Sequence, residues 1–596
     1  MSTFRASVDA FLDELFRLQP VLATDAGMHA HDGRWPDVSP AGEAELLAAL
    51  DRWSARWSVL DGDSLSPDER IDRDFLLLQV DALRFSTAEL RELEWDALAW
   101  VYLLGGGLFP LLAREFAPLD RRLTSTAARL EGVPALLETA RARLGSATGR
   151  PASRLHAETA EAQIAGIREL IDDALRVAEA TALVDASVNA LLPRLRDAAA
   201  GAIEALDAFA THLRTVLIPV AAGEGRLGPE LFAAKLERTL LSPHPDPDEI
   251  MAEARRQYAA VRAEMVRIAR ESWPAWMGDA VLPTAGSAGG EAAADEAIVR
   301  AVLDAIASEH RAPSEILDFC RAELGRIEAF CRERDLVGLT DEPLAIEWTP
   351  AFLRSVGGAM LIPPGPLDRG ERAFFAVTPI PDDWAPERVA SYLREDNDRM
   401  LRLLTVHEAV PGHYLQLSWA NRCSSLPRVV FGSGVFAEGW AVYVEQVLMD
   451  LGYADGDPAL TLTHWKLYLR SVINALIDVG IHTSGMTEAE AMELMVHGGF
   501  QEEAEARAKY ARARLTSTQL STYFVGAIEM WRRERDRRAA LAVASGDPRT
   551  ADGVSEGPVP GGPGETPGFR YREHLERVLS YGTPPIPILR RFILED

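Results

Sequence analysis

Three side chains in one short segment, His407, Glu408 and His413, have the residue types of a hydrolytic zinc site. Such sites commonly use three protein ligands, an open position for water and a carboxylate that accepts a proton from this water. The imidazoles of His407 and His413 are suited to bind the ion, and Glu408 directly follows the first histidine, as in the H-E-x-x-H motif. We therefore predict a Zn²⁺ site with His407 and His413 as ligands and Glu408 as the catalytic general base.

The spacing of the two histidines does not fit a regular helix. In H-E-x-x-H the histidines lie about 40° apart around the helix, whereas the spacing of His407 and His413 corresponds to about 240°. Pro411 and Gly412 lie between them. Because proline interrupts the helical hydrogen bonds and glycine adopts conformations closed to other residues, we expect a local bulge there that returns His413 to the metal side.

The third ligand is expected from a second helix, which the apolar spacing of residues 436–445 predicts. Glu438 and Glu445 are seven residues apart on it and therefore share one face. Glu438 is the candidate third ligand, and Glu445 is a candidate to orient a ligand through a hydrogen bond. The residues alone leave open that these histidines and carboxylates instead form ion pairs in the core or on the surface.

The elements that must position these residues are mainly helices. Residues 170–183 and 198–216 place apolar side chains three and four residues apart, as amphipathic helices do. Residues 246–273 and 294–334 have the same pattern. The sequence therefore predicts a mainly α-helical fold.

Strand signals are scarce and lie just before the proposed site. Residues 372–378 carry the strongest signal and residues 359–362 a weaker one, with the turn-rich segment 363–370 between them. We predict a small hairpin or sheet. Its edge strand could pair with an extended substrate, or the hairpin could be purely structural.

Composition and charge argue against several classes of partner. Hydrophobic residues make up 47% and charged residues 26% of the 596 residues, as is ordinary for a globular protein. The net charge of −28 disfavours binding to nucleic acid or to an anionic membrane surface. Because the N-terminal segment has no apolar signal core and no apolar run is long enough to span a membrane, we expect a cytoplasmic location.

The three cysteines are too few and too scattered for a disulfide framework, and burial is expected for them.

The residues around these motifs resemble the DUF885 family. The resemblance extends over nearly the whole chain, and the H-E-A-V-P-G-H and E-G-W-A-x-Y motifs are specific together. It is carried by residues 23–24, 32–37, 394–395, 397–400, 404–416, 431–434, 436–443, 478–482 and 515–526. The family in turn is similar, distantly, to the gluzincin peptidases, especially the thimet-oligopeptidase and carboxypeptidase Taq groups. This similarity implies a two-lobed helical fold with a deep cleft.

The resemblance also implies a division of the chain. Residues 1–340 are expected to form a mainly helical region on one side of the cleft, and residues 341–596 the catalytic region with the metal site. The second region includes residues 545–568, where abundant glycine and proline predict a mobile loop.

The resemblance to the gluzincins implies roles for further residues. Their third zinc ligand is a glutamate followed seven residues later by another, and Glu438 and Glu445 match this pair. A tyrosine later in the chain is implied as a hydrogen-bond donor to the reacting carbonyl, and Tyr523 is the candidate. The alternative is that Tyr523 only packs between helices. His482 lies on a family motif and either stands near the site or is a core histidine. Arg512 could anchor a substrate carboxylate or be an exposed helix residue.

These observations predict a zinc-dependent hydrolase, with a peptidase acting on short peptides as the preferred interpretation. Glu408 would be the base, and Tyr523 or His482 would stabilise the oxyanion. Hydrolysis of a non-peptide amide, or other metal-assisted chemistry on a small molecule, fits the same motif, because metal-activated water attacks any carbonyl. A catalytically degenerate metal-binding or ligand-binding protein would result if the Pro-Gly insertion moved His413 away from the metal. The sequence does not determine the oligomeric state.

Overall fold

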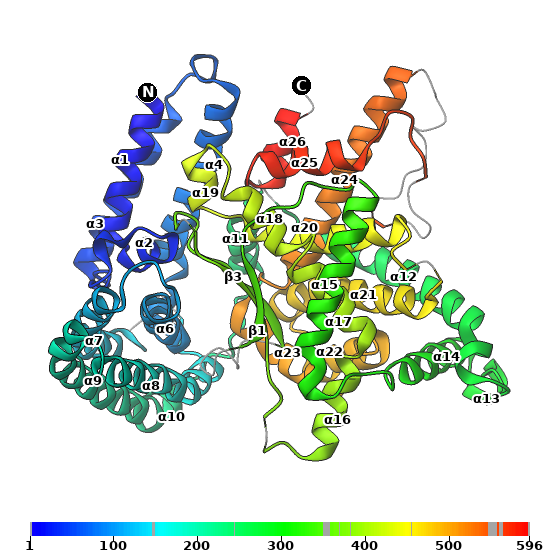
Figure 1. Ribbon diagram of the computed structural model, residues 1–596, viewed down its shortest axis with the longest axis horizontal. Helices are drawn as coiled ribbons and strands as arrows, with labels where there is room; N and C mark the ends of the chain where they lie inside the picture. The colour runs from blue at the N-terminus through cyan, green and yellow to red at the C-terminus, as the bar shows by residue number, and fades with distance from the viewer. Residues whose placement is uncertain are drawn as a thin grey trace.

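The chain is mainly helical and contains one small mixed sheet (Figure 1), as the sequence predicts. This computed structural model describes residues 3–593 except 146–149, 243–244, 350–357, 369, 382, 455, 546–556 and 559–563. Most of the loop predicted at residues 545–568 lies outside the described residues. Among the described residues, no single helix is long and apolar enough to cross a membrane, although the bent pair Pro67–Trp95 and Ala97–Ala113, which meets at 106°, passes the same test of length and composition.

The N-terminal helices, blue to cyan in Figure 1, lie on one side of the sheet. They form two apolar clusters, one around α1, α3 and α4 and the other around α6–α9. The predicted helical segments 170–183 and 198–216 fall largely in α8 and α9. The bounds are α1 (Thr3–Leu18), α2 (Pro20–Ala26), α3 (Pro40–Ser58), α4 (Pro67–Phe85), α5 (Glu92–Trp95), α6 (Ala97–Ala113), α7 (Leu119–Arg143), α8 (Arg154–Ala182), α9 (Ala186–His212) and α10 (Ile218–Val220).

Most helices from α12 onward lie on the other side of the sheet. They surround the largest core cluster, in which α21 is buried along almost its whole length. This core takes residues from both sides of position 340, so the division into 1–340 and 341–596 stays a prediction. The bounds are α11 (Pro229–Leu240), α12 (Pro247–Met277), α13 (Ala285–Ala288), α14 (Glu291–Ile306), α15 (Ile316–Glu333), α16 (Pro386–Glu395), α17 (Asp398–Glu408), α18 (His413–Ala420), α19 (Leu426–Val430), α20 (Gly434–Asp450), α21 (Pro458–Thr483), α22 (Glu488–Met492), α23 (Glu503–Thr516), α24 (Ser521–Ser545), α25 (Tyr571–Ser580) and α26 (Ile586–Ile593).

The sheet contains the predicted hairpin and one strand more. Strands β2 (Ala359–Ile362) and β3 (Ala373–Val377) are antiparallel, and β1 (Leu344–Trp348) is added parallel to β3, giving the order β1-β3-β2. One face of the sheet packs on α15, α16 and α17 through an apolar cluster that includes Phe375. Strand β2 is therefore an edge strand, next to the helix that carries His407 and Glu408.

The loop after β2 is fastened to the N-terminal helices by His29. Its Nδ1 lies 2.9 Å from Asp32 Oδ2 and its Nε2 lies 2.9 Å from Asp368 Oδ1, while its ring stacks on Phe116. Nearby, the Leu367 N–H donates to the Ala26 carbonyl oxygen at 2.9 Å. Burial alone would lower the pKa of His29, but the two carboxylates raise it to about 9. His29 is therefore a charged link between two distant parts of the chain.

His29→Gln is expected to lower stability in a pH-dependent way. The pKa of His29 in the folded protein lies above the unfolded value of about 6.5, so its contribution is complete below that pH and is lost as the pH rises through about 9. We expect the variant to lose about 2 kcal/mol at pH 6 and little at pH 10, measured as the free energy of unfolding in urea. His31→Gln, in the same turn, is the control and should follow the unchanged protein. An identical loss at both pH values would contradict the assignment.

Candidate metal centre

The chain leaves the helix between the two histidines of the predicted site. Helix α17 ends at Glu408 and α18 begins at His413, and the Val410–Pro411 peptide bond between them is cis. The expected bulge within one helix is therefore wrong in detail, because four residues form a separate connection. The Trp440 indole N–H of α20 donates to the Pro411 carbonyl oxygen at 2.8 Å and holds this connection in place.

Gly412 is required by the close approach of the backbone in this connection. A Cβ atom at position 412 would lie 1.9 Å from the His407 carbonyl oxygen and 2.4 Å from that of Val406. The Gly412 N–H also donates to the Val406 carbonyl oxygen at 3.1 Å. The glycine thus lets the start of α18 fold back against the end of α17.

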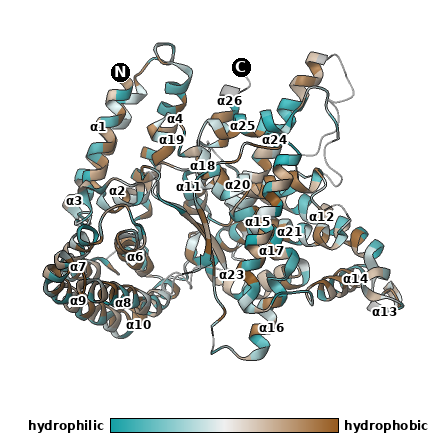
Figure 2. Ribbon diagram, in the orientation of Figure 1, coloured by the Kyte–Doolittle hydropathy of each residue, from teal (hydrophilic) through white to brown (hydrophobic). Residues whose placement is uncertain are grey.

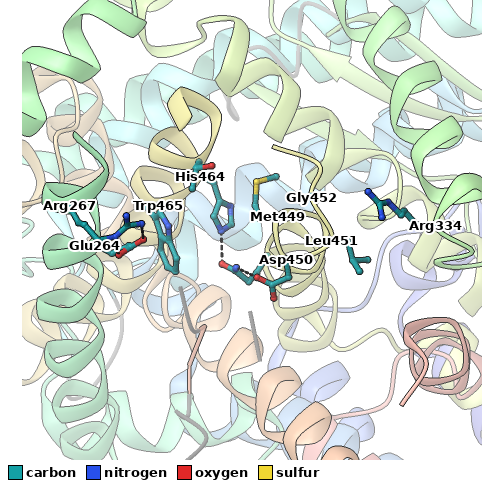
Figure 3. Close-up of a pocket in the computed structure, with 11 residues that line it drawn as sticks. Glu264, Arg267, Arg334, Met449, Asp450, Leu451, Gly452, His464 and Trp465 are labelled. Atoms are coloured by element: carbon teal, nitrogen blue, oxygen red, sulfur yellow. Dashed lines mark hydrogen bonds and ion pairs between the residues drawn. The ribbon is translucent and has the colours of Figure 1, made fainter. Parts of the chain in front are cut away.

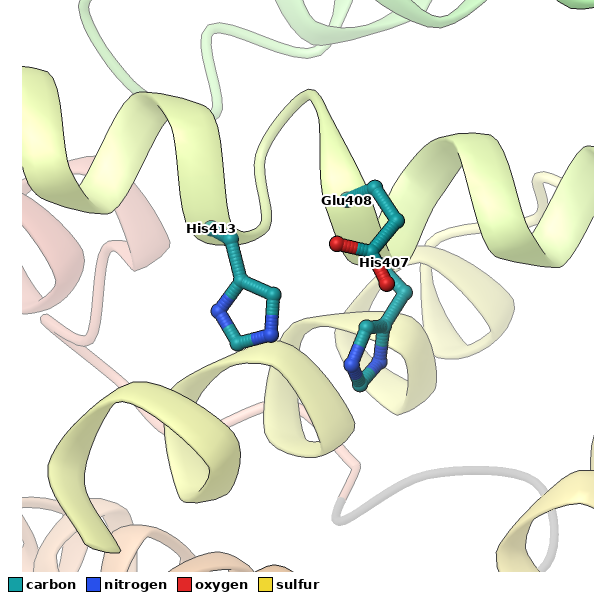
Figure 4. Close-up of side chains that lie close together, drawn as sticks. All are labelled: His407, Glu408 and His413. Carbon is teal, nitrogen blue, oxygen red and sulfur yellow. The ribbon is translucent and has the colours of Figure 1, made fainter. Parts of the chain in front are cut away.

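This backbone path brings the two imidazoles together. Figure 4 shows His407 and His413 projecting to the same side from their two helices, with Glu408 beside them. The ring centroids are 4.7 Å apart and the ring planes are nearly perpendicular, at 88°. Ligand atoms of His407, Glu408 and His413 all lie within 4.8 Å of one another, so this group could hold a metal ion.

Glu438 of α20 faces both histidines. Its Oε2 lies 3.7 Å from His407 Nε2 and 3.5 Å from His413 Nε2. Ligand atoms at about 2.0–2.1 Å from a tetrahedral zinc ion would be about 3.3 Å apart, and the two distances from Glu438 Oε2 are close to this value. Although burial alone raises the pKa of Glu438, the two histidines bring it well below its usual value. The donor set and the spacing both suit zinc.

Glu445, two turns later on α20, contacts the opposite nitrogen of His407. Its Oε1 lies 2.6 Å from His407 Nδ1, and its side chain is buried. Burial raises the pKa of Glu445, and His407 opposes this rise. With Nδ1 engaged in this way, Nε2 of His407 is left facing Glu438 and His413.

Glu408 is held by the edge strand of the sheet. The Leu361 N–H of β2 donates to Glu408 Oε2 at 2.9 Å, and the Glu408 side chain is largely buried. Sequence reasoning missed this contact, because a backbone donor leaves no signature in residue type. The strand therefore aligns the carboxylate beside the two imidazoles.

Tyr523 of α24 lies near Glu438 because α20 and α24 approach closely. A Cβ atom on Gly439 would lie 2.3 Å from the Gly526 carbonyl carbon, so both helices depend on glycine at this contact. Burial, followed by the negative charge of Glu438, raises the pKa of Tyr523 to about 12, so the hydroxyl keeps its proton at neutral pH. Arg512 of α23 is exposed, and its Nη2 lies 3.5 Å from the Tyr523 hydroxyl.

His482 does not join this group in the structure. Its Nδ1 accepts from the Leu227 N–H at 3.1 Å, its Nε2 bonds the Ala513 carbonyl oxygen at 3.0 Å, and its ring stacks on Phe232. Burial lowers the pKa of His482 to about 4. Because both ring nitrogens have backbone partners, the expected oxyanion role of His482 is not supported, and the alternative of a core histidine fits.

A polar cavity of about 420 Å³ lies at the C-terminal end of α20 (Figure 3). His464 Nε2 lies 2.8 Å from Gln446 Oε1, and the Gln446 amide donates to Asp450 at 2.6 Å. Among the described residues, the cluster at His407 is the one set of three or more His, Cys, Asp or Glu side chains close enough to hold an ion. The described residues that line this cavity contain no such set.

Comparisons with known proteins support the fold and assign no activity to it. A model of the DUF885 family, described as bacterial protein of unknown function, matches residues 20–593. A solved structure from Shewanella oneidensis is 28% identical with a TM-score of 0.79, each chain covering 100% of the other. One from Colwellia psychrerythraea is 15% identical with a TM-score of 0.76, over 100% of this chain and 99% of that one, and shows the fold alone. Both are described as "putative lipoprotein", the first also as "of unknown function". No curated protein matches the chain.

Proposed function

The chain belongs to the DUF885 family, whose function is unknown, and we propose that it is a zinc-dependent hydrolase that cleaves short peptides. The observation that supports this most strongly is the placement of Glu438 Oε2 within 3.7 Å of the Nε2 atoms of both His407 and His413. Two imidazoles and one carboxylate, with a further carboxylate alongside, form the donor set of many hydrolytic zinc sites.

His407, His413 and Glu438 would hold the ion, and Glu445 would fix the ring of His407. When bound, zinc supplies a Lewis acid that polarises a carbonyl group and makes water more acidic. The hydrogen bond from Glu445 to Nδ1 keeps Nε2 of His407 available as the ligand atom, as groups behind metal-bound histidines commonly do. Glu445 is therefore proposed as a positioning residue.

Glu408 is proposed to move the proton. It accepts a proton from the attacking water and returns it to the amine of the leaving fragment, which is the role of a general base followed by that of a general acid. The Leu361 N–H engages one carboxylate oxygen, Oε2, and leaves Oε1 to face the reacting water. The hydrogen bond to Oε2 fixes the orientation of the carboxylate, and Oε1 can still accept the proton.

Tyr523 and Arg512 are proposed to act on the substrate. The protonated Tyr523 hydroxyl can donate a hydrogen bond to the oxygen that becomes negative during attack, a contribution worth about 3 kcal/mol in other enzymes. Arg512, beside this hydroxyl, is placed to pair with a carboxylate of a short peptide. His482 is left out of the proposed catalytic group.

Strand β2 is proposed to bind the peptide backbone. The Leu361 N–H points to Glu408 and away from β3, so the Ala359 N–H and the carbonyl oxygens of Ala359 and Leu361 are the groups on this edge that can pair with a substrate. An extended peptide can pair with such an edge and place a peptide bond next to Glu408. We further propose that the two groups of helices beside the sheet are the lobes of a gluzincin-like fold with a deep cleft between them.

Two other functions use the same residues. A small-molecule amide would meet the same base and the same donors, and a degenerate binding protein would keep the ligands without turnover. The edge strand next to Glu408 favours a peptide. A cytoplasmic location remains a prediction, and the solved relatives described as lipoproteins make an envelope location the alternative.

Purified protein is expected to contain about one zinc ion per chain and to lose peptide cleavage when a chelator removes it. Elemental analysis and digestion of a peptide library measure the two properties on the same sample. Adding zinc back should restore cleavage, whereas adding magnesium should not, because imidazole ligands favour zinc. Cleavage that persists after complete removal of the metal would exclude the proposal.

A further inference from the structure

An apolar cavity of about 520 Å³ lies between the sheet and the N-terminal helices. Helices α6, α7 and α8 supply one wall, with Leu112, Leu123 and Leu170 as representative side chains. Its volume falls in the range of about 300–1,000 Å³ that is typical of small-ligand pockets. None of the candidate site residues lines it, so it is a separate part of the molecule.

The sheet supplies the opposite wall through one of its faces. Ile362 of β2 is paired with Phe374 of β3, and both line the cavity. The neighbouring pair, Leu361 and Phe375, points to the other face, where Phe375 packs in the cluster with α15–α17. Figure 2 shows the strands coloured mainly as hydrophobic. The cavity therefore occupies the face of the sheet that α15–α17 leave uncovered.

The cavity begins one residue along β2 from the contact with Glu408. Leu361 donates its N–H to Glu408, and Ile362 lines the cavity. A peptide paired with the free edge of β2 would continue the pleat of the sheet, and alternate side chains would project to the cavity side. A side chain near the reacting bond can therefore reach this cavity.

Several charged residues line the edge of the cavity, and some of them have partners there. The Glu115 N–H donates to Glu371 at 3.1 Å, Arg372 lies 3.9 Å from Glu347, and the Arg372 guanidinium lies over the Phe374 ring at 4.9 Å. The apolar walls between these pairs favour a ligand group without charge. An aromatic or large aliphatic side chain has this chemistry and benefits most from leaving water.

We propose that this cavity binds a bulky apolar group and, resting on the proposed peptidase function, that the group is an aromatic or large aliphatic side chain of the peptide substrate. The cavity would then determine which peptides are cleaved, while the residues around His407 carry out the cleavage.

Binding of a neutral apolar probe tests the cavity without any metal or turnover. N-phenyl-1-naphthylamine is added to the metal-free full-length chain, and its fluorescence gives the dissociation constant. Ala113→Trp on α6 should fill the cavity and weaken binding by about 10-fold or more, and the smaller change Ala174→Leu on α8 serves if the first variant misfolds. Ala165→Trp, at an exposed position on α8, is the matched control and should bind as the unchanged protein does. Equal binding by all folded variants would overturn the cavity as an apolar site.

Cleavage of a peptide set tests the assignment to the substrate. Alanine peptides in which each position in turn is Phe are digested by the zinc-loaded protein. One Phe position should raise kcat/KM by about 10-fold or more over the all-alanine peptide, and in Ala113→Trp the ratio of the two kcat/KM values should fall to about one. A preference that is absent, or that survives Ala113→Trp, overturns the assignment while the peptidase proposal stands. If no peptide is cleaved but Ala113→Trp still blocks the probe, the peptidase proposal fails and the apolar site stands.

Discussion

Glu408→Gln is expected to keep its zinc and to lose peptide cleavage. Glutamine has nearly the shape of glutamate, and its amide oxygen can still accept the hydrogen bond from the Leu361 N–H. It cannot take up a proton from water at neutral pH, so the loss of general-base catalysis should lower kcat/KM by about 100- to 10,000-fold. Zinc content by elemental analysis and kcat/KM on one cleaved peptide are the two measurements.

The zinc content of this variant decides between two roles of Glu408. The ligand atoms of His407, Glu408 and His413 are close enough to hold an ion by themselves, so Glu408 could be a ligand in place of Glu438. If it is, Glu408→Gln will lose zinc and Glu438→Gln will retain it. Under our proposal, Glu408→Gln keeps its zinc and Glu438→Gln loses it. Glu387→Gln, at an exposed position on α16, is the control for the substitution and should change neither property.

The candidate site residues could be predicted from the sequence because residue type and spacing indicate their chemistry. Glu438 and Glu445 are seven residues apart, and one continuous helix, α20, carries both to the side of His407. Local periodicity is sufficient for such a pair, since a helix has a fixed geometry. The predominance of helix and the β2–β3 hairpin followed from local signals of the same kind.

The features that sequence reasoning missed depend on contacts between distant segments. The connection at residues 409–412 is held by Trp440, whose spacing indicated only an apolar stripe. Strand β1 forms because it pairs with β3 in parallel. Parallel strands are not joined by a tight turn, so the local sequence gives no sign of the pairing. His482 lies on a family motif, but its backbone partners, Leu227 and Ala513, could not be identified from spacing.

Gly412→Ala is expected to remove the metal site without touching a ligand. The added Cβ would lie 1.9 Å from the His407 carbonyl oxygen, so the backbone at the start of α18 must move. His413 is the next residue and would move with it, away from Glu438. Groups that only orient a ligand change metal affinity by about 10- to 100-fold, so displacement of a ligand itself should cost about 100-fold or more in zinc affinity. Competition with a chelating dye measures this affinity directly.

Gly434→Ala separates the geometric effect from the general effect of replacing glycine. Gly434 begins α20, close in the chain to Glu438, and a Cβ atom there would meet no atom within 4 Å. The same substitution should therefore leave both zinc affinity and stability nearly unchanged, whereas Gly412→Ala should also lose about 1–3 kcal/mol of folding free energy through crowding. If Gly412→Ala bound zinc as tightly as the unchanged protein, the two histidines would not need this backbone path to converge. The proposal that the Pro-Gly connection builds the metal site would then fail, even if Glu408 proved to be essential.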